Sequence, residues 1–117
     1  MSRSLRKQAS PESFLPVPPA TFHILLALAG GDLHGYAIMS TIKDWSGDVL
    51  RADEGSLYPA LHRMEEAGWI RAKWVAKDSG RRVRIYELRA AGEKRLNAEE
   101  SRWQVVTAAV NRVLRTV

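Results

Sequence analysis

The chain contains no cysteine. Disulfide bonds and zinc sites built on cysteine are therefore excluded, and the composition permits a reducing compartment. Long apolar runs are also missing. The longest, such as residues 24–29, are far shorter than the roughly 20 residues that a membrane-spanning helix needs. The charged N-terminus is not followed by the apolar core of a secretory signal. We therefore expect a cytoplasmic protein that does not enter a membrane.

The residue patterns that enzymes use are missing as well. No nucleophile with a paired base, no pair of carboxylates and no glycine-rich loop that would hold a phosphate stands out. Residues 78–80, Asp-Ser-Gly, are typical of a turn. His23 has no second histidine at metal-ligand spacing. We expect neither enzymatic activity nor a metal site nor a cofactor.

The chain has an excess of positive charge. Its 117 residues are enough for one domain with a modest core, and they carry a net charge of +5. A basic balance favours anionic partners such as nucleic acids or membrane surfaces. It says nothing about the fold.

The segment most informative about function is residues 54–70. Leu57, Leu61, Met64 and Gly68 recur at helical spacing and form one stripe. Pro59 is expected near the start of this helix, where backbone N–H groups lack partners, and Gly68 is expected to end the helix. The opposite face and its flanks carry the polar side chains and the proline: Ser56, Tyr58, Pro59, His62, Arg63 and Glu66. A short helix with such a face fits the major groove of DNA. The alternative is an ordinary amphipathic helix with a solvated outer face.

Two further helices are expected before this one. The first covers residues 19–29 and is apolar almost all round, so it should be buried, with His23 as a core residue. The second runs from residue 34 or 35 to residue 45. The expected inward-facing positions in the first helix are Phe22, Leu25, Leu26 and Ala29, with Ile24 and Leu28 widening the stripe. In the second helix they are Ile38, Ile42 and Trp45. Three helices joined by short turns are typical of a helix-turn-helix unit.

A β-hairpin is predicted after the third helix. Residues 69–76 and 82–88 alternate between apolar and polar side chains, and Gly80 suits the loop between them. A hairpin in this position is the wing of a winged helix. Cations are expected to cluster at or beside its tip and to bind DNA phosphates: Lys73, Lys77, Arg81, Arg82 and Arg84. The alternative is a charged hairpin that only contacts water.

A long last helix is expected from residue 90 or 91 to the C-terminus. Its apolar residues recur at alternating spacings of three and four, a coiled-coil pattern in which Glu99 is the one polar member. The stripe is formed by Leu96, Glu99, Trp103, Val106, Val110, Val113 and Val117. It predicts a dimer contact. The alternative is that the stripe packs on the first helix of its own domain.

These elements predict an α+β fold that is mostly α, a winged helix-turn-helix with a C-terminal dimerisation helix. The expected divisions are a tail at residues 1–18, a DNA-binding domain at 19–89 and the dimerisation helix at 90–117. The tail contains several prolines and the cations Arg3, Arg6 and Lys7. We expect it to be mobile; the alternative is a basic arm that contacts DNA.

Several motifs together resemble the PadR family of bacterial transcriptional regulators. The most specific covers residues 55–65, Gly-Ser-Leu-Tyr-Pro-Ala-Leu-His-Arg-Met-Glu. The others are Leu33-His34-Gly35-Tyr36, Gly68, the wing segment 80–88 and, more weakly, Ala91-Gly92. The resemblance covers residues 19–92, and the single C-terminal helix is similar to the short branch of the family.

The resemblance implies a homodimer that binds an inverted-repeat DNA operator, usually as a repressor. In some members an aromatic small-molecule effector binds at the dimer interface. The implied roles are DNA reading for Ser56, Tyr58, Pro59, His62 and Arg63, wing contacts for Arg81, Arg82 and Arg84, and dimerisation for Trp103, Val106 and Val110. Trp103 either stacks on an effector or fills the dimer core.

A second function remains open at this point. Winged helices also serve as protein-docking modules with no DNA role, and this alternative predicts no salt-dependent affinity for DNA.

Overall fold

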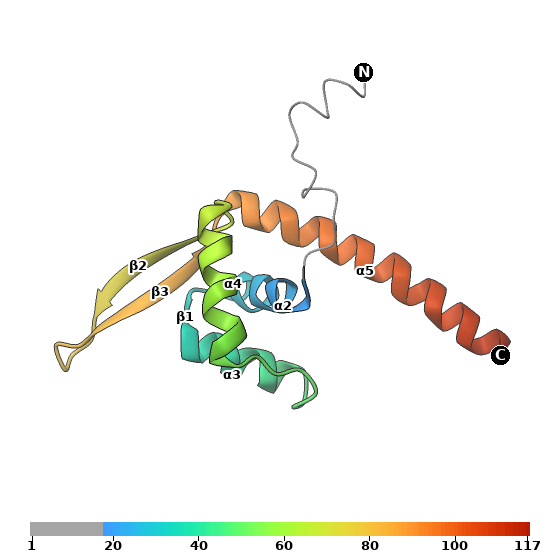
Figure 1. Ribbon diagram of the computed structural model, residues 1–117, viewed down its shortest axis with the longest axis horizontal. Helices are drawn as coiled ribbons and strands as arrows, with labels where there is room; N and C mark the ends of the chain where they lie inside the picture. Colours follow the sequence, from blue (N-terminus) through green and yellow to red (C-terminus); the bar gives the residue numbers. More distant parts are fainter. Residues whose placement is uncertain (1–17) are drawn as a thin grey trace, which may run out of the picture.

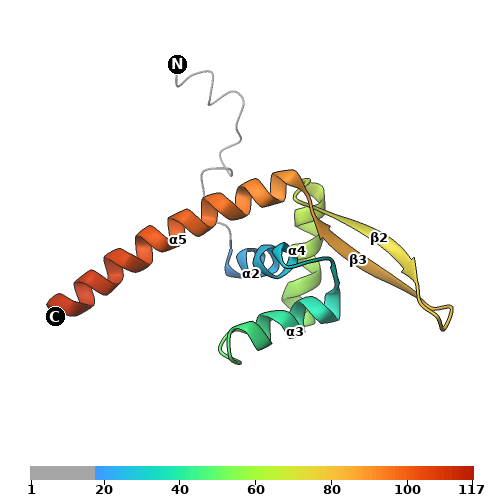
Figure 2. The same cartoon turned by 180° about the vertical axis from the view of Figure 1, so that it is seen from behind.

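The computed structural model describes residues 18–117 of the chain. In chain order, the elements are α2 (Pro19–Ala29), β1 (Leu33–His34), α3 (Gly35–Trp45), α4 (Glu54–Glu66), β2 (Ile70–Ala76), β3 (Arg82–Leu88) and α5 (Ala90–Thr116). Figures 1 and 2 show α2, α3 and α4 grouped together, with the β2–β3 hairpin and α5 extending from the group. This is a winged helix-turn-helix followed by a long C-terminal helix, as the sequence predicted.

The sheet has one strand more than the sequence predicted. Its three antiparallel strands lie in the order β1-β3-β2, so β3 is central. The extra strand β1 pairs Leu33 with Tyr86 and His34 with Ile85. Two residues are too few to show an alternating pattern, which is why no periodicity indicated this strand. β1 ties the start of α3 to the base of the wing.

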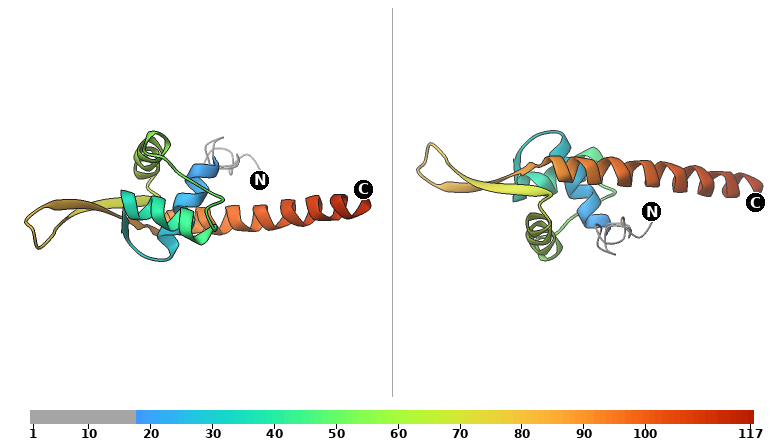
Figure 3. Two further views of the ribbon diagram at one scale, coloured as in Figure 1. Left: turned by 90° about the horizontal axis from the view of Figure 1, so that it is seen from below. Right: turned by 90° about the horizontal axis from the view of Figure 1, so that it is seen from above.

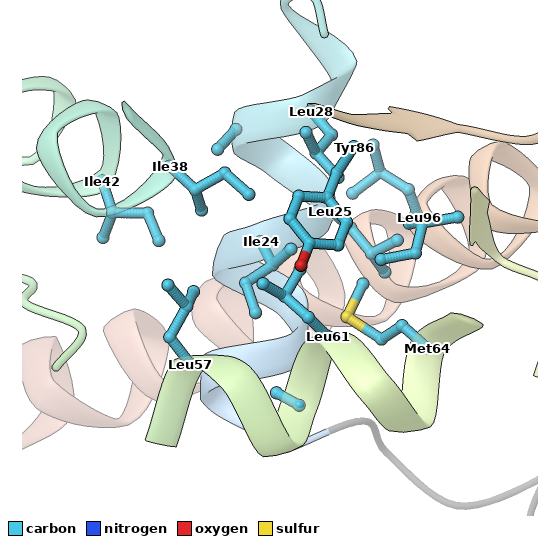
Figure 4. Packing of buried hydrophobic residues seen from close by; sticks show 13 residues of the cluster. Ile24, Leu25, Leu28, Ile38, Ile42, Leu57, Leu61, Met64, Tyr86 and Leu96 are labelled. Atoms are coloured by element: carbon cyan, nitrogen blue, oxygen red, sulfur yellow. The ribbon is translucent and has the colours of Figure 1, made fainter. Parts of the chain in front are cut away.

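The hydrophobic core lies between the three grouped helices, the base of the hairpin and the first turns of α5. In Figure 4, the labelled side chains of α2, α3, α4, β3 and α5 point toward one another around Leu25. The labelled core residues are Ile24, Leu25, Leu28, Ile38, Ile42, Leu57, Leu61, Met64, Tyr86 and Leu96. All are at most 5% exposed. The predicted stripe of α4 is therefore confirmed for Leu57, Leu61 and Met64, with Ala60 as an additional buried member, whereas Gly68 lies beyond the end of the helix at Glu66.

The inward-facing positions of the first two helices were predicted only in part. On α2, Leu25 and the two residues that widen the predicted stripe, Ile24 and Leu28, are buried, whereas Leu26 and Ala29 are exposed. Because α2 is apolar almost all round, the spacing of its apolar residues does not indicate which face is buried. Trp45 was predicted to face inward, but its side chain is 67% exposed. Its ring covers Gly30 instead: Cη2 lies 2.7 Å from the position that a Cβ of Gly30 would occupy.

The hairpin and the C-terminal part of α5 extend from opposite sides of the domain (Figures 1 and 3). Only the first part of α5 packs on the core, where Leu96 is 5% exposed. Within residues 18–117, no helix is both long and apolar enough to cross a membrane. The predicted tail lies outside the described residues, except for Pro18.

Candidate nucleic-acid interface

The start of α4 is stabilised by a side-chain cap. Asp53 has extended backbone angles, and its Oδ1 accepts a hydrogen bond of 2.8 Å from the backbone N–H of Ser56. The Ser56 hydroxyl donates to the carbonyl of Asp53 at 3.3 Å. Glu54 adds a negative charge in the first turn, where the helix dipole favours it. The cap holds the exposed Ser56 at the front of the candidate reading helix.

Pro59 lies farther into the helix than predicted. Because α4 begins at Glu54, Pro59 is an interior residue and leaves the carbonyl of Gly55 without its helical donor. Gly55 is exposed, so water reaches that carbonyl. After the helix, Gly68 has a φ of 79°, the left-handed conformation expected of a glycine that ends a helix.

The outer face of α4 is exposed and polar, as predicted. Pro59, His62 and Arg63 all face solvent. His62 Nε2 lies 3.4 Å from Glu66 Oε1, an exposed pair that contributes little to stability. Arg63 has no carboxylate partner within residues 18–117. Its guanidinium is therefore available to a base edge or a phosphate.

Tyr58 connects two of the sequence motifs. Its ring is half exposed at the side of α4 and lies against the first residue of α3. The Tyr58 hydroxyl is only 2.6 Å from where a Cβ of Gly35 would be. Next to it, His34 Nδ1 caps α3 by accepting a 3.1 Å hydrogen bond from the N–H of Ala37. The motifs around Gly35 and Tyr58 thus form one contact, in which a glycine makes room for the phenol.

The predicted wing cations do not form a single cluster. In the hairpin register, Arg84 lies opposite Trp74 and Arg82 opposite Ala76, so both arginines share one face. Lys73 lies opposite Ile85 on the other face. Lys77 and Arg81 flank the turn, which Gly80 closes with a φ of 83°. Alternation along a strand predicted the faces of each strand, but only the register shows which residues of the two strands lie together.

Two of the wing cations are paired with carboxylates. Arg84 Nη2 donates to both oxygens of Glu65 on α4, at 3.0 and 2.8 Å. Lys73 Nζ lies 3.7 Å from Glu87 and 3.9 Å from Asp32. The hydrogen bond from Arg71, helped by the charges of Arg71 and Lys73, lowers the pKa of Glu87.

The remaining wing cations are exposed and have no carboxylate partner within residues 18–117. They are Lys77, Arg81 and Arg82. Because Glu65 holds Arg84, this exposed group belongs to a hairpin that lies beside α4.

The predicted stripe on α5 divides into two parts. Leu96 is part of the domain's own core, and Glu99 pairs with Arg95 at 3.4 Å. Trp103 is 60% exposed, and its ring centre lies 6.5 Å from that of Phe22 on α2. Beyond Trp103 the stripe is exposed: Val106, Val110, Val113 and Val117. The alternative of packing on the first helix therefore holds for the start of the stripe only.

His23 lines a cavity of about 240 Å³ between α2, α3 and the segment after α3. Its partial burial lowers its pKa. Leu26, Ile42 and Trp45 are among the other lining residues. Within the described residues, no group of three or more metal-ligating side chains comes together.

Sequence reasoning missed Glu65 and Trp74. Glu65 looked like one more charge on a helix, and Trp74 like an apolar residue on the inner side of a strand. No local pattern marks their contacts with the wing arginines.

Comparison with known proteins identifies the family. The model of the transcriptional regulator PadR-like family matches residues 24–98. This chain belongs to that family. It is therefore a PadR-family transcriptional regulator, and the contact between Gly35 and Tyr58 joins two of the motifs that carry the resemblance.

Relatives of known structure have the same fold. A PadR family transcription regulator from Clostridium difficile is 26% identical with a TM-score of 0.73, over 83% of this chain and 99% of the other. PadR of Bacillus subtilis, solved in complex with operator DNA, is 27% identical with a TM-score of 0.61, over 67% of this chain and 44% of the other.

A sequence relative is much longer. An uncharacterised 37.1 kDa protein in a transposon of Streptomyces fradiae is 42% identical over 76 residues, which make up 65% of this chain. The match spans 20% of the length of that relative.

Proposed function

We propose that this PadR-family protein binds a specific DNA operator through α4 and the wing. The observation that carries the proposal is that both α4 and the adjoining hairpin carry exposed cations that have no carboxylate partner within residues 18–117. Arg63 lies on the outer face of α4, and the hairpin that bears Lys77, Arg81 and Arg82 is held beside α4 by the Glu65–Arg84 pair. The operator complex of Bacillus subtilis PadR supports this proposal.

Each part of the interface has its own role in this proposal. Arg63 and His62 contact base edges or phosphates in the major groove, and Ser56, Tyr58 and Pro59 lie along the flanking backbone. The wing cations Lys77, Arg81 and Arg82 contact phosphates and add affinity without sequence preference. Lys73 and Arg84 stay with their carboxylates at the middle of the hairpin.

The acting form in this proposal is a homodimer. Residues 19–89 bind DNA, and residues 90–117 hold the two copies together. The support is the exposed valine stripe of α5, since an apolar stripe of this length on a helix surface is stabilised by a partner. A two-fold dimer presents two α4 helices to an inverted repeat.

The proposal includes a location in the cytoplasm. It also includes repression, because a protein bound to an operator blocks access to that DNA. It also includes an aromatic small-molecule effector that stacks on Trp103. That ring is 60% exposed at the point where the stripe leaves the domain. If Trp103 only fills the dimer core, a Trp103→Phe variant will respond to effectors as the wild type does.

The first test is selection of bound sequences from a random DNA pool at two salt concentrations. We expect an enriched inverted repeat and steep salt dependence.

Arg63→Ala should lower operator affinity by about 1–3 kcal/mol, the value of a good base contact. The double change Arg81→Ala with Arg82→Ala should reduce the salt slope by about 0.9 for each phosphate that is no longer neutralised.

Lys94→Ala is the control for these variants. It removes one positive charge from an exposed position of α5, which belongs to neither α4 nor the wing hairpin. Operator affinity should change little. Equal losses in Lys94→Ala and Arg63→Ala would overturn the assignment of α4 as the reading helix. A wild-type protein with no salt-dependent DNA affinity would instead favour the protein-docking function.

A further inference from the structure

A continuous series of contacts joins α4 to the outer half of the wing. Glu65 on α4 accepts both hydrogen bonds from Arg84 Nη2. The Arg84 guanidinium lies 5.9 Å from the ring centre of Trp74 and 5.7 Å from that of Tyr86. Arg82, one pair nearer the tip, lies 5.2 Å from the same Trp74 ring. Both distances to Trp74 are within the range of a cation–π interaction.

These contacts begin where the hydrophobic core ends. Tyr86 is 4% exposed and Trp74, the next residue toward the tip on the same face, is 57% exposed. Past Tyr86, the core therefore no longer holds the hairpin. The Glu65–Arg84 pair is the next attachment to α4, with Glu65 25% and Arg84 44% exposed.

Arg84 and Arg82 differ in whether a carboxylate balances their charge. Arg84 has a carboxylate partner, so much of its charge is already balanced within the domain. Arg82 rests on the Trp74 ring and has no carboxylate partner within residues 18–117, so its charge remains available to a phosphate. Fixing the ring fixes the surface on which Arg82 lies.

We infer that Glu65 is a positioning residue for DNA recognition. Through Arg84 and Trp74 it sets the position of the wing relative to α4 and directs Arg82 toward the DNA backbone. It also keeps Arg84 from binding DNA phosphates irrespective of the base sequence. This inference rests on the proposed function, since it concerns how the same DNA site discriminates between operator and other DNA.

The test uses Glu65→Gln, which keeps the shape of the side chain and removes its charge. The released Arg84 should bind phosphate, so affinity for random-sequence DNA should rise and its salt slope should steepen by about 0.9 per protomer. Operator affinity should fall because the wing is no longer held. The ratio of operator to random affinity should drop by about two- to tenfold, in the lower range for coupled side chains.

Glu100→Gln is the matched control, because Glu100 is an exposed acidic residue on α5 and belongs to neither α4 nor the wing. It raises the net charge equally, so both affinities should rise together and the ratio should stay the same. The double variant Glu65→Gln with Arg84→Gln has no cation to release, and its affinity for random DNA should not exceed that of the wild type. A thermal melt of each variant establishes that it is folded at the assay temperature.

The outcomes separate the two proposals. If the wild type binds DNA and Glu65→Gln matches Glu100→Gln in ratio and slope, the positioning role is overturned and the DNA-binding function stands. If Glu65→Gln unfolds, Arg84→Gln alone decides: an unchanged ratio overturns the role, and a lowered ratio supports it. If the wild type has no salt-dependent DNA affinity, the proposed function itself fails.

Discussion

Gly92 and Gly35 are glycines because of neighbours that are distant in sequence. A Cβ on Gly92 would lie 2.1 Å from the carbonyl oxygen of Trp69. The same oxygen accepts a 2.9 Å hydrogen bond from the N–H of Arg89, just before α5. The first turn of α5 is thereby pressed against the start of β2, and only a glycine allows this approach. The Ala-Gly motif, weak as a sequence signal, thus has a clear steric cause.

Gly92→Ala should destabilise the domain. The added methyl group overlaps with backbone that cannot move easily, at a cost of about 1–3 kcal/mol or more. The gain of about 1 kcal/mol in helix propensity offsets only part of this cost. Denaturant unfolding would measure the loss. Gly55→Ala, where the added Cβ meets only the Asp53 carboxylate at 3.3 Å, should change stability by much less. Equal stability of the Gly92→Ala variant and the wild type would contradict this steric account.

The helix α5 is a single element with two surroundings. Its first turns belong to the domain, where Leu96 is buried and Arg95 stacks on Trp69 at 5.5 Å. Its later turns present valines to solvent, among them Val110 at 51% exposure. The heptad pattern runs through both parts without a break, because packing within the chain and packing on a partner require the same spacing of apolar residues.

Val110→Asp should weaken the proposed dimer and leave the monomer folded. Each protomer would lose the burial of a valine, about 1.5 kcal/mol or more, and would place a charge in the contact. We expect the dimer dissociation constant from sedimentation equilibrium to rise at least about tenfold, with unchanged helix content by circular dichroism.

Val105→Asp is the control for the dimer contact. Val105 is 71% exposed on the same helix but lies off the stripe. Val105→Asp therefore makes the same change in helix propensity without altering the proposed dimer contact. Comparable dissociation constants for the two variants would show that the stripe is not the dimer surface.

The molecule is extended for its size. Its radius of gyration is 16.7 Å, whereas a compact chain of this length would have about 13 Å. The wing and the end of α5 contribute to this extended shape, since they reach out on opposite sides of the domain (Figure 1). Both are only partly covered by the chain itself, and the proposed function gives each a partner, DNA for the wing and a second copy for α5.

A two-fold dimer of this shape should require a fixed phase between its half-sites. Once an operator has been selected, inserting five base pairs, about half a helical turn, places one half-site on the opposite side of the duplex. Affinity should fall at least about tenfold, since only one half-site can then be bound. Changing the spacer sequence at constant length is the control. An operator that tolerates the insertion would contradict the rigid dimer.

The sequence by itself determined the helices, the hairpin and the family. Apolar spacing reports which residues of one segment share a face, and the motif at residues 55–65 is specific enough to identify its relatives. Exposed residues of α4 such as Arg63 could be placed in this way, because exposure on an amphipathic helix is a property of that helix alone.

Only the tertiary structure decided which side chains from different segments meet. It paired Arg84 with Glu65, turned Trp45 outward onto Gly30, added β1 to the sheet and placed Leu96 in the core. Each of these depends on the distance between groups far apart in the chain. Local periodicity carries no information about that distance, because it depends on how the helices pack and on the register in which the strands pair.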